Sequence, residues 1–170
     1  MLADGRLSEE SVDMAELVRS IPSNMIVKPG KMKAENAVTV KPFQGGALVR
    51  GNRDSLVSMI CNIASNCACH SFKKRGEHAM TEVELQVEGG YAVVTVTDNG
   101  PGMSPYQLEA LKRPFYTTGG TGIGLTEADV TARMHGGSMD ISSVPGEGSV
   151  FTVRIPLSDF SPKGVNVKGL

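Results

Sequence analysis

The sequence predicts an α+β fold with two layers, in which one mixed β-sheet carries helices on one face. Three observations lead to this prediction. Segments with alternating apolar residues occur in pairs, and glycine-rich turns separate the members of each pair. Segments with an apolar residue at every third or fourth position stand between these pairs. The chain has 170 residues, 40% of them hydrophobic and 21% charged, which suits a single globular domain over residues 1–170.

The N-terminal part of the chain predicts one helix and two strands. Residues 12–21 have an amphipathic pattern, and we expect Pro22 to end this helix. Residues 36–43 and 47–51 have the composition of strands, and a Gly-Gly turn at 45–46 lies between them. This segment therefore reads as a helix followed by two strands around a turn.

The strongest helical pattern of the chain runs from about residue 53 to residue 71. Its apolar residues recur at the spacing of one helical face, and a charged turn is expected over residues 73–78. We expect this helix to bury its apolar face in the core. The face consists of Leu56, Met59, Ile60, Ile63, Ala64, Cys67 and Ala68.

The C-terminal half predicts two hairpins with two helices between them. Ser104 as N-cap and Pro105 in the first turn are expected to open the first helix. Gly136 and Gly137 are expected to end the second helix. The predicted strands span 81–88, 91–98, 138–144 and 149–157, the helices span 105–111 and 124–135, and residues 158–170 are expected to form a loose tail.

Charge and composition argue against several classes of protein. The net charge is −1 and the pI is about 6.3, so no basic footprint indicates binding of nucleic acid. No apolar run approaches the ~18 residues of a membrane span, and the N-terminus lacks the apolar segment of a signal peptide. Cys61, Cys67 and Cys69 form no C-x-x-C motif, so neither a disulfide framework nor a zinc site is predicted. We expect a cytoplasmic location, with the cysteines as small apolar residues of a helix.

Two asparagines on the long helix are candidate metal ligands. Asn62 and Asn66 are four residues apart and share one face, beside the apolar face. Amide oxygens suit a hard cation such as Mg²⁺, which keeps most of its waters. The alternative is a solvated helix face, and for an isolated pair of asparagines that alternative is favoured.

The segment DNGPGM at residues 98–103 follows directly after a predicted strand. Asp98 can accept a hydrogen bond from an exocyclic amine, as adenine carries, and Gly100 and Gly102 allow the backbone to approach a planar ligand. The same residue types form turns without any ligand. Taken alone, the segment fits a turn and a binding site equally well.

A glycine-rich loop at residues 119–125 leads into a predicted helix. Such a loop presents backbone N–H groups and a helix N-terminus to phosphate. It lacks the G-K-[ST] of a Walker A loop, and it departs from the dinucleotide fingerprint. The alternative, a flexible linker, is disfavoured by the apolar residues Ile123 and Leu125.

Together these segments resemble the ATP-binding catalytic domain of sensor histidine kinases, in the superfamily that includes gyrase B, Hsp90 and MutL. The resemblance covers roughly residues 11–157 and implies the Bergerat-type ATP-binding fold, a two-layer α/β sandwich. It rests on five short boxes in the same order and spacing. They are residues 62–66 (NIASN), 98–103 (DNGPGM), 113–118 (RPFYTT), 120–125 (GTGIGL) and 146–149 (GEGS).

The resemblance implies a role for residues of each box. Asn66 would bind Mg²⁺, with Asn62 beside it as a second ligand or water-orienting group, and the two form the catalytic pair. Asp98 would accept a hydrogen bond from the adenine amine, and Phe115 would anchor the lid over the nucleotide. Ser149 would reach the adenine pocket through water. The other residues implied to contact the nucleotide are Gly100, Gly102, Met103, Gly120, Thr121, Gly122, Ile123, Gly124 and Leu125.

The function implied by the resemblance is that of the Mg-ATP-binding catalytic domain of a two-component sensor histidine kinase. Such a domain donates the γ-phosphoryl group of ATP to a histidine on a separate dimerisation domain, and a response regulator is the further partner. None of the three histidines of the chain stands in the sequence context of that acceptor. Two alternatives stay open: a nucleotide-binding regulatory module without kinase activity, and a serine kinase of the anti-sigma type.

Three features depart from the pattern of sensor histidine kinases. Cys69 stands where the family often has a lysine aimed at phosphate, and the lid segment 116–119 is short. Glu127 and Asp129 place negative charge close to the start of the helix that would face phosphate. We therefore expect modest ATP affinity. Asn62 stands where the ATPases of the superfamily have a glutamate that activates water, so little ATP hydrolysis is expected.

Overall fold

The computed structural model describes residues 10–25, 38–111 and 123–159. Within them, five strands form one sheet in the order β2–β4–β5–β7–β6. β2 runs parallel to β4 and the other neighbours are antiparallel, so the sheet is mixed. The strands are β2 (Thr39–Val40), β4 (Thr81–Glu88), β5 (Tyr91–Asp98), β6 (Ser138–Val144) and β7 (Gly148–Pro156).

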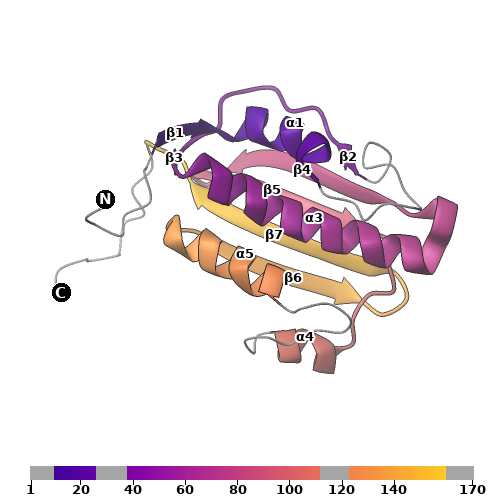
Figure 1. The fold of residues 1–170 in the computed structure, drawn as a ribbon. Coiled ribbons are helices and arrows are strands. Elements are labelled where there is room, and N and C mark those ends of the chain that lie inside the picture. The colour runs from indigo at the N-terminus through magenta and orange to yellow at the C-terminus, as the bar shows by residue number, and fades with distance from the viewer. Residues whose placement is uncertain (1–9, 26–37, 112–122, 160–170) are drawn as a thin grey trace, which may run out of the picture.

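Helices cover one face of this sheet. Figure 1 shows α1 (Met14–Asn24), α3 (Arg53–Arg75) and α5 (Ile123–Met134) in one layer in front of the strands. The short helix α4 (Pro105–Leu111) lies near the β6 edge. The predicted α+β fold, a mixed sheet with helices on one face, is confirmed.

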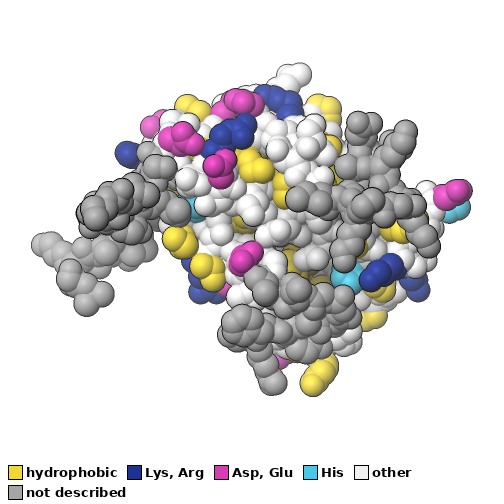
Figure 2. All heavy atoms as spheres, viewed as in Figure 1, with side chains coloured by type: hydrophobic (Ala, Val, Ile, Leu, Met, Phe, Trp, Pro, Cys, Tyr) yellow, Lys and Arg dark blue, Asp and Glu magenta, His cyan; other side chains and the backbone are white. Residues whose placement is uncertain are grey.

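The core lies between the helices and the sheet. All seven residues of the predicted apolar face of α3 are buried, none of them more than 3% exposed. They pack in one cluster with buried residues of the central strands, among them Val94 and Val96 of β5 and Val153 of β7. Figure 2 shows the outer side of the helical layer, where acidic and basic side chains mix and hydrophobic ones form only small groups.

The two predicted hairpins are present, and the helices between them begin and end as expected. β4 and β5 pair along their full lengths, and every residue of β6 pairs with β7. The hydroxyl of Ser104 accepts from the N–H of Gln107 at 3.3 Å, while Oε1 of Gln107 accepts from the N–H of Ser104 at 2.8 Å. This reciprocal pair caps α4. After α5, Gly136 has φ +74° and the N–H of Gly137 donates to the carbonyl of Ala132 at 2.9 Å, which closes the helix.

The N-terminal region differs from the prediction. β3 (Leu48–Gly51) does not form a hairpin with β2; it pairs with β1 (Glu10–Asp13) in a separate two-stranded sheet, and β2 joins the main sheet beside β4. In this register Val12 lies opposite Val49, and both are buried. Burial of this pair decides the partner of β3, and the sequence alone does not reveal it because the two segments are far apart in the chain.

Two helix boundaries also differ from the prediction. Pro22 lies inside α1, which continues to Asn24, because a proline in the last turn removes only one hydrogen bond and the N–H of Met25 still donates to the carbonyl of Ile21 at 3.1 Å. α3 continues through the predicted charged turn to Arg75 and ends at Gly76 with φ +59°. Basic residues favour the last turn of a helix, since its carbonyls carry partial negative charge.

Candidate nucleotide-binding site

Asp98 is the last residue of β5 and lies at the centre of the candidate site. Its side chain is buried, with the residue only 7% exposed, and its Oδ1 accepts from the N–H of Gly100 at 2.7 Å. Ser149 of β7 is its register partner and is 8% exposed. The predicted proximity of Ser149 to Asp98 therefore follows from strand pairing.

Cys67 of α3 is a buried neighbour of Asp98. Burial raises the pKa of the Cys67 thiol well above its usual value, and the neighbouring Asp98 carboxylate, to which the thiol donates a hydrogen bond, raises it further. Burial also raises the pKa of Cys61 to about 11. Both cysteines therefore remain neutral thiols, as expected of small apolar residues, whereas Cys69 is exposed and packs in no core.

The loop after β5 is fixed by hydrogen bonds of its own side chains and of a neighbour. Oδ1 of Asn99 accepts from the N–H of Met80 at 2.8 Å, and its Nδ2 donates to the carbonyl of His78 at 2.8 Å. Arg75, at the end of α3, donates from Nε to the carbonyl of Asn99 and from Nη2 to that of Gly146, each at 2.9 Å. These bonds tie the loop to the end of α3 and to the β6–β7 turn.

The β6–β7 hairpin supports the same loop from its other side. Gly102 has φ +64°, and a Cβ there would collide with the carbonyl of Val144. The N–H of Met103 donates to Oγ of Ser143 at 2.8 Å, and that hydroxyl donates to the carbonyl of Gly148 at 2.7 Å. Only glycine fits at position 102, because the loop passes directly against the hairpin backbone.

Asn62 and Asn66 lie on α3 as the helical spacing predicted. Both side chains are half-buried, and in the described part of the chain neither forms a hydrogen bond. The first turn of α5 packs against them: a Cβ on Gly124 would lie 3.7 Å from Cβ of Asn62 and 3.9 Å from Nδ2 of Asn66. Two neighbouring amides whose oxygens accept no hydrogen bond from a described residue fit the ligand preference of Mg²⁺.

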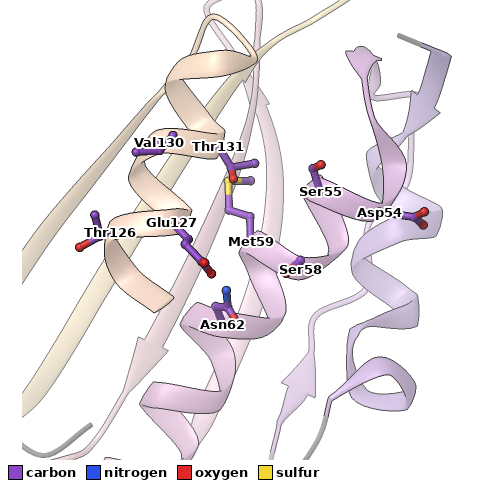
Figure 3. Close-up of a pocket in the computed structure, with 9 residues that line it drawn as sticks. All are labelled: Asp54, Ser55, Ser58, Met59, Asn62, Thr126, Glu127, Val130 and Thr131. Atoms are coloured by element: carbon purple, nitrogen blue, oxygen red, sulfur yellow. The ribbon is translucent and has the colours of Figure 1, made fainter. Parts of the chain in front are cut away.

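A cleft of about 660 Å³ opens between α3 and α5. Met59 lies at its base, and Asn62 belongs to its lining. Figure 3 shows Glu127, from the first turns of α5, and Asn62, from α3, pointing toward one another across this cleft. The cleft thus places the Glu127 carboxylate beside Asn62, one of the two predicted metal ligands, whereas the sequence alone indicated only a charge that would repel phosphate.

The structure places the remaining predicted residues as follows. Leu125 is half-buried and packs against the core, as does Met103. Ile123 begins α5. Gly100 is buried, and a Cβ there would lie 2.7 Å from Oδ1 of Asp98, so a side chain at this position would disturb the carboxylate. Phe115, Gly120, Thr121 and Gly122 lie outside the described residues, so their predicted contacts with the nucleotide stay predictions.

Sequence reasoning missed three residues that hold the Asp98 loop. Asn99 lies within the motif itself, and its turn-forming residue type was a usable signal. Arg75 lies in the segment 73–78 that was predicted as a charged turn, and its guanidinium donates to the carbonyls of Asn99 and Gly146. Ser143 lies on an exposed strand with regular alternation, and nothing in its local sequence distinguishes it.

Comparison with known proteins identifies the family. The family described as histidine kinase-, DNA gyrase B-, and HSP90-like ATPase matches residues 51–159. This chain belongs to that family. The match covers every described element from the end of β3 to β7 and therefore includes the whole candidate site.

Individual relatives agree with this assignment. The sensor histidine kinase ZraS of Salmonella typhimurium is 33% identical over 111 residues, which cover 64% of this chain and 23% of ZraS. This chain thus spans about a quarter of the length of that relative. Its resemblance to sensor histidine kinases, predicted from the sequence, is confirmed.

Solved structures share the fold. The catalytic domain of histidine kinase ThkA aligns with a TM-score of 0.71 and 21% identity, covering 89% of this chain and 99% of that one. Full-length ShkA in complex with AMPPNP aligns with a TM-score of 0.70 and 22% identity, covering 91% of this chain and 32% of ShkA. At this level of identity the likeness concerns the fold. Among the described helices, none is long and apolar enough to cross a membrane.

Proposed function

We propose that this chain binds Mg-ATP and acts as the catalytic domain of a two-component sensor histidine kinase. The observation that carries the proposal is the pairing of a buried, pre-positioned carboxylate at Asp98 with the amides of Asn62 and Asn66, to which no described residue forms a hydrogen bond. A carboxylate can accept a hydrogen bond from the exocyclic amine of adenine, and amide oxygens can coordinate a metal ion. Family membership supports assigning both to one nucleotide.

At the adenine end, Asp98 acts as a hydrogen-bond acceptor of fixed orientation. The Gly100 N–H and the Cys67 thiol both donate to its carboxylate, and these bonds fix the orientation of the side chain. Because the side chain is buried, a ligand that offers its oxygen no hydrogen-bond donor binds with a free-energy penalty. Ligands without a matching amine are therefore disfavoured. Adenine selectivity is the expected consequence.

At the phosphate end, Asn66 and Asn62 would hold Mg²⁺. The metal supplies charge neutralisation on the phosphates and orients them for in-line transfer. The chain's own contribution is to position the α5 start and the asparagine face, which packing already brings together. Transfer of the γ-phosphoryl group to a histidine needs mainly such positioning.

The acceptor histidine and the response regulator are partners that we place outside this chain. We expect the domain to lie in the cytoplasm as part of a longer sensor, and we expect little hydrolysis of ATP, since Asn62 is no base.

One observation favours a second candidate, a nucleotide-binding regulatory module without kinase activity. Cys69 stands where the family often has a lysine directed at phosphate. Its side chain is exposed, and a cysteine cannot supply the positive charge of that lysine. Of the basic residues that follow, Arg75 is committed to loop carbonyls. A phosphate end with fewer cations would bind the nucleotide but transfer its γ-phosphoryl group poorly.

The test is transfer of label from γ-³²P-ATP to a purified dimerisation domain of a related sensor kinase. We expect an acid-labile phosphohistidine with the wild-type chain. Asp98→Asn replaces an acceptor with an amide that also carries donors, and we expect it to weaken ATP binding by roughly tenfold to a hundredfold in calorimetry, about 1.5–3 kcal/mol. ATP binding without any transfer, to several such domains, would favour the regulatory module. ATP affinity unchanged in Asp98→Asn would remove the adenine role.

A further inference from the structure

Glu127 is an exposed carboxylate that lines the cleft between α3 and α5. In the described part of the chain it forms no hydrogen bond or ion pair. Its neighbour on the same helix, Asp129, differs: its Oδ2 accepts from Nε of Arg133 at 2.9 Å. Glu127 instead lines the cleft together with Asn62, and the two side chains point toward one another in Figure 3.

The backbone arrangement brings Glu127 and both asparagines to one place. Gly124 touches the Asn62 and Asn66 side chains, and Glu127 follows it by three residues, which is one helical turn on the same face of α5. Asn62 and Asn66 are themselves one turn apart on α3. Glu127 and Asn62 therefore line the cleft from its two helices, and Asn66 lies one turn further along α3, against the start of α5.

The chemistry of this set suits a divalent cation better than the two amides do alone. Amide oxygens are neutral and offset none of the charge of Mg²⁺, whereas protein magnesium sites usually include one or two carboxylates beside substrate phosphates and waters. We propose that Glu127 is the anionic member of the magnesium site, binding the ion directly or through one of its waters. This inference rests on the proposed binding of Mg-ATP.

The assignment changes how the charge of Glu127 acts on ATP. Without a metal, the carboxylate repels the phosphates, as its position near the start of α5 suggests. With Mg²⁺ between them, the same carboxylate attracts the metal and through it the phosphates. Glu127 therefore makes ATP binding depend more steeply on magnesium than the two asparagines would alone.

The experiment measures ATP affinity by calorimetry with EDTA and with Mg²⁺, on the wild-type chain and Glu127→Gln. We expect Glu127→Gln to bind metal-free ATP more tightly and to lose about tenfold of the gain in affinity that Mg²⁺ provides. Asp129→Asn is the matched control, because it removes the same charge two residues away, outside the cleft lining. It should leave the gain from Mg²⁺ within about twofold of wild type.

A second readout reports the metal itself. Mn²⁺ in place of Mg²⁺ gives an electron paramagnetic resonance signal from which the free ion is counted, and Glu127→Gln should weaken Mn²⁺ binding to the ATP-loaded chain. If Glu127→Gln binds ATP more tightly by the same factor in EDTA and in Mg²⁺, Glu127 acts only by repelling the phosphates, and the inference is overturned. Unchanged ATP affinity under both conditions would overturn it as well. Failure of the wild-type chain to bind ATP would instead overturn the proposed function, and this inference with it. Unchanged circular dichroism confirms that the variants fold.

Discussion

The two ends of the candidate site are built in opposite ways. At the Asp98 end, the side chains of Asp98 and Asn99 are held by hydrogen bonds of 2.7–2.8 Å, and Arg75 binds the loop carbonyls. At the asparagine end, Asn62 and Asn66 form no hydrogen bond with any described residue. We call the Asp98 end closed, because described residues already hydrogen-bond its polar side chains. We call the asparagine end open, because no described residue does so there.

This difference follows from what each end would bind. A base is planar and rigid, so a carboxylate fixed in advance binds it without an ordering cost. A hydrated metal with a triphosphate brings its own ligands, and protein oxygens already engaged by the chain would not be free to join them. The contrast predicts that substitutions at the closed end reduce stability, whereas those at the open end cost no stability and change how ATP binding depends on Mg²⁺.

Gly102→Ala should have the largest effect. The φ of +64° is strained for alanine, and the new Cβ would collide with the carbonyl of Val144 in the β6–β7 hairpin. We expect a loss of about 3 kcal/mol in the free energy of unfolding, measured by urea denaturation, together with weaker ATP binding.

Gly89→Ala is the matched control for that substitution. Gly89 has a similar φ of +58°, in the β4–β5 turn, but nothing lies within 4 Å of a Cβ there. It should cost only the backbone term, about 1 kcal/mol, and leave ATP binding unchanged. Equal losses in the two variants would show that the Asp98 loop is not packed against the hairpin.

Asn99→Ala tests the closed end through hydrogen bonds alone. The substitution leaves the N–H of Met80 and the carbonyl of His78 without their present partner. Since this region is partly open to water, we expect a loss of about 1–2 kcal/mol in the free energy of unfolding. Thermal and urea unfolding measure it, and a variant as stable as the wild type would contradict a loop fixed by Asn99.

The sequence predicted those parts of the fold that local patterns specify. The apolar face of α3, both hairpins and the caps around α4 and α5 depend on neighbouring residues, and all were predicted. The pairing of β3 with β1 was not, because it depends on burial of Val12 against Val49, which are distant in sequence. The extent of α1 beyond Pro22 depends on its place in the last turn, which a composition rule cannot resolve.

The candidate site shows the same division. Strand ends and helical spacing were enough to predict where Asp98, Asn62 and Asn66 lie, since each lies at a position defined by its own element. Their roles were implied only by the family resemblance. The support from Arg75 and Ser143 arises where α3, the loop and a remote hairpin meet. No periodicity reports such a meeting, and the role inferred for Glu127 likewise needs the packing of α5 on α3.

Asn66→Ala should have the smallest effect on stability, with the opposite sign to Asn99→Ala. The two variants remove the same amide, but Asn66 has no hydrogen bond with described residues to lose. Alanine is the better helix former, so the free energy of unfolding should rise by about 0.5 kcal/mol. Calorimetry should show that ATP binding loses most of its gain from Mg²⁺ while binding in EDTA stays nearly unchanged. A clear loss of stability would mean that the Asn66 amide is already engaged in the free protein, and the contrast between an open and a closed end would fail at its most sensitive position.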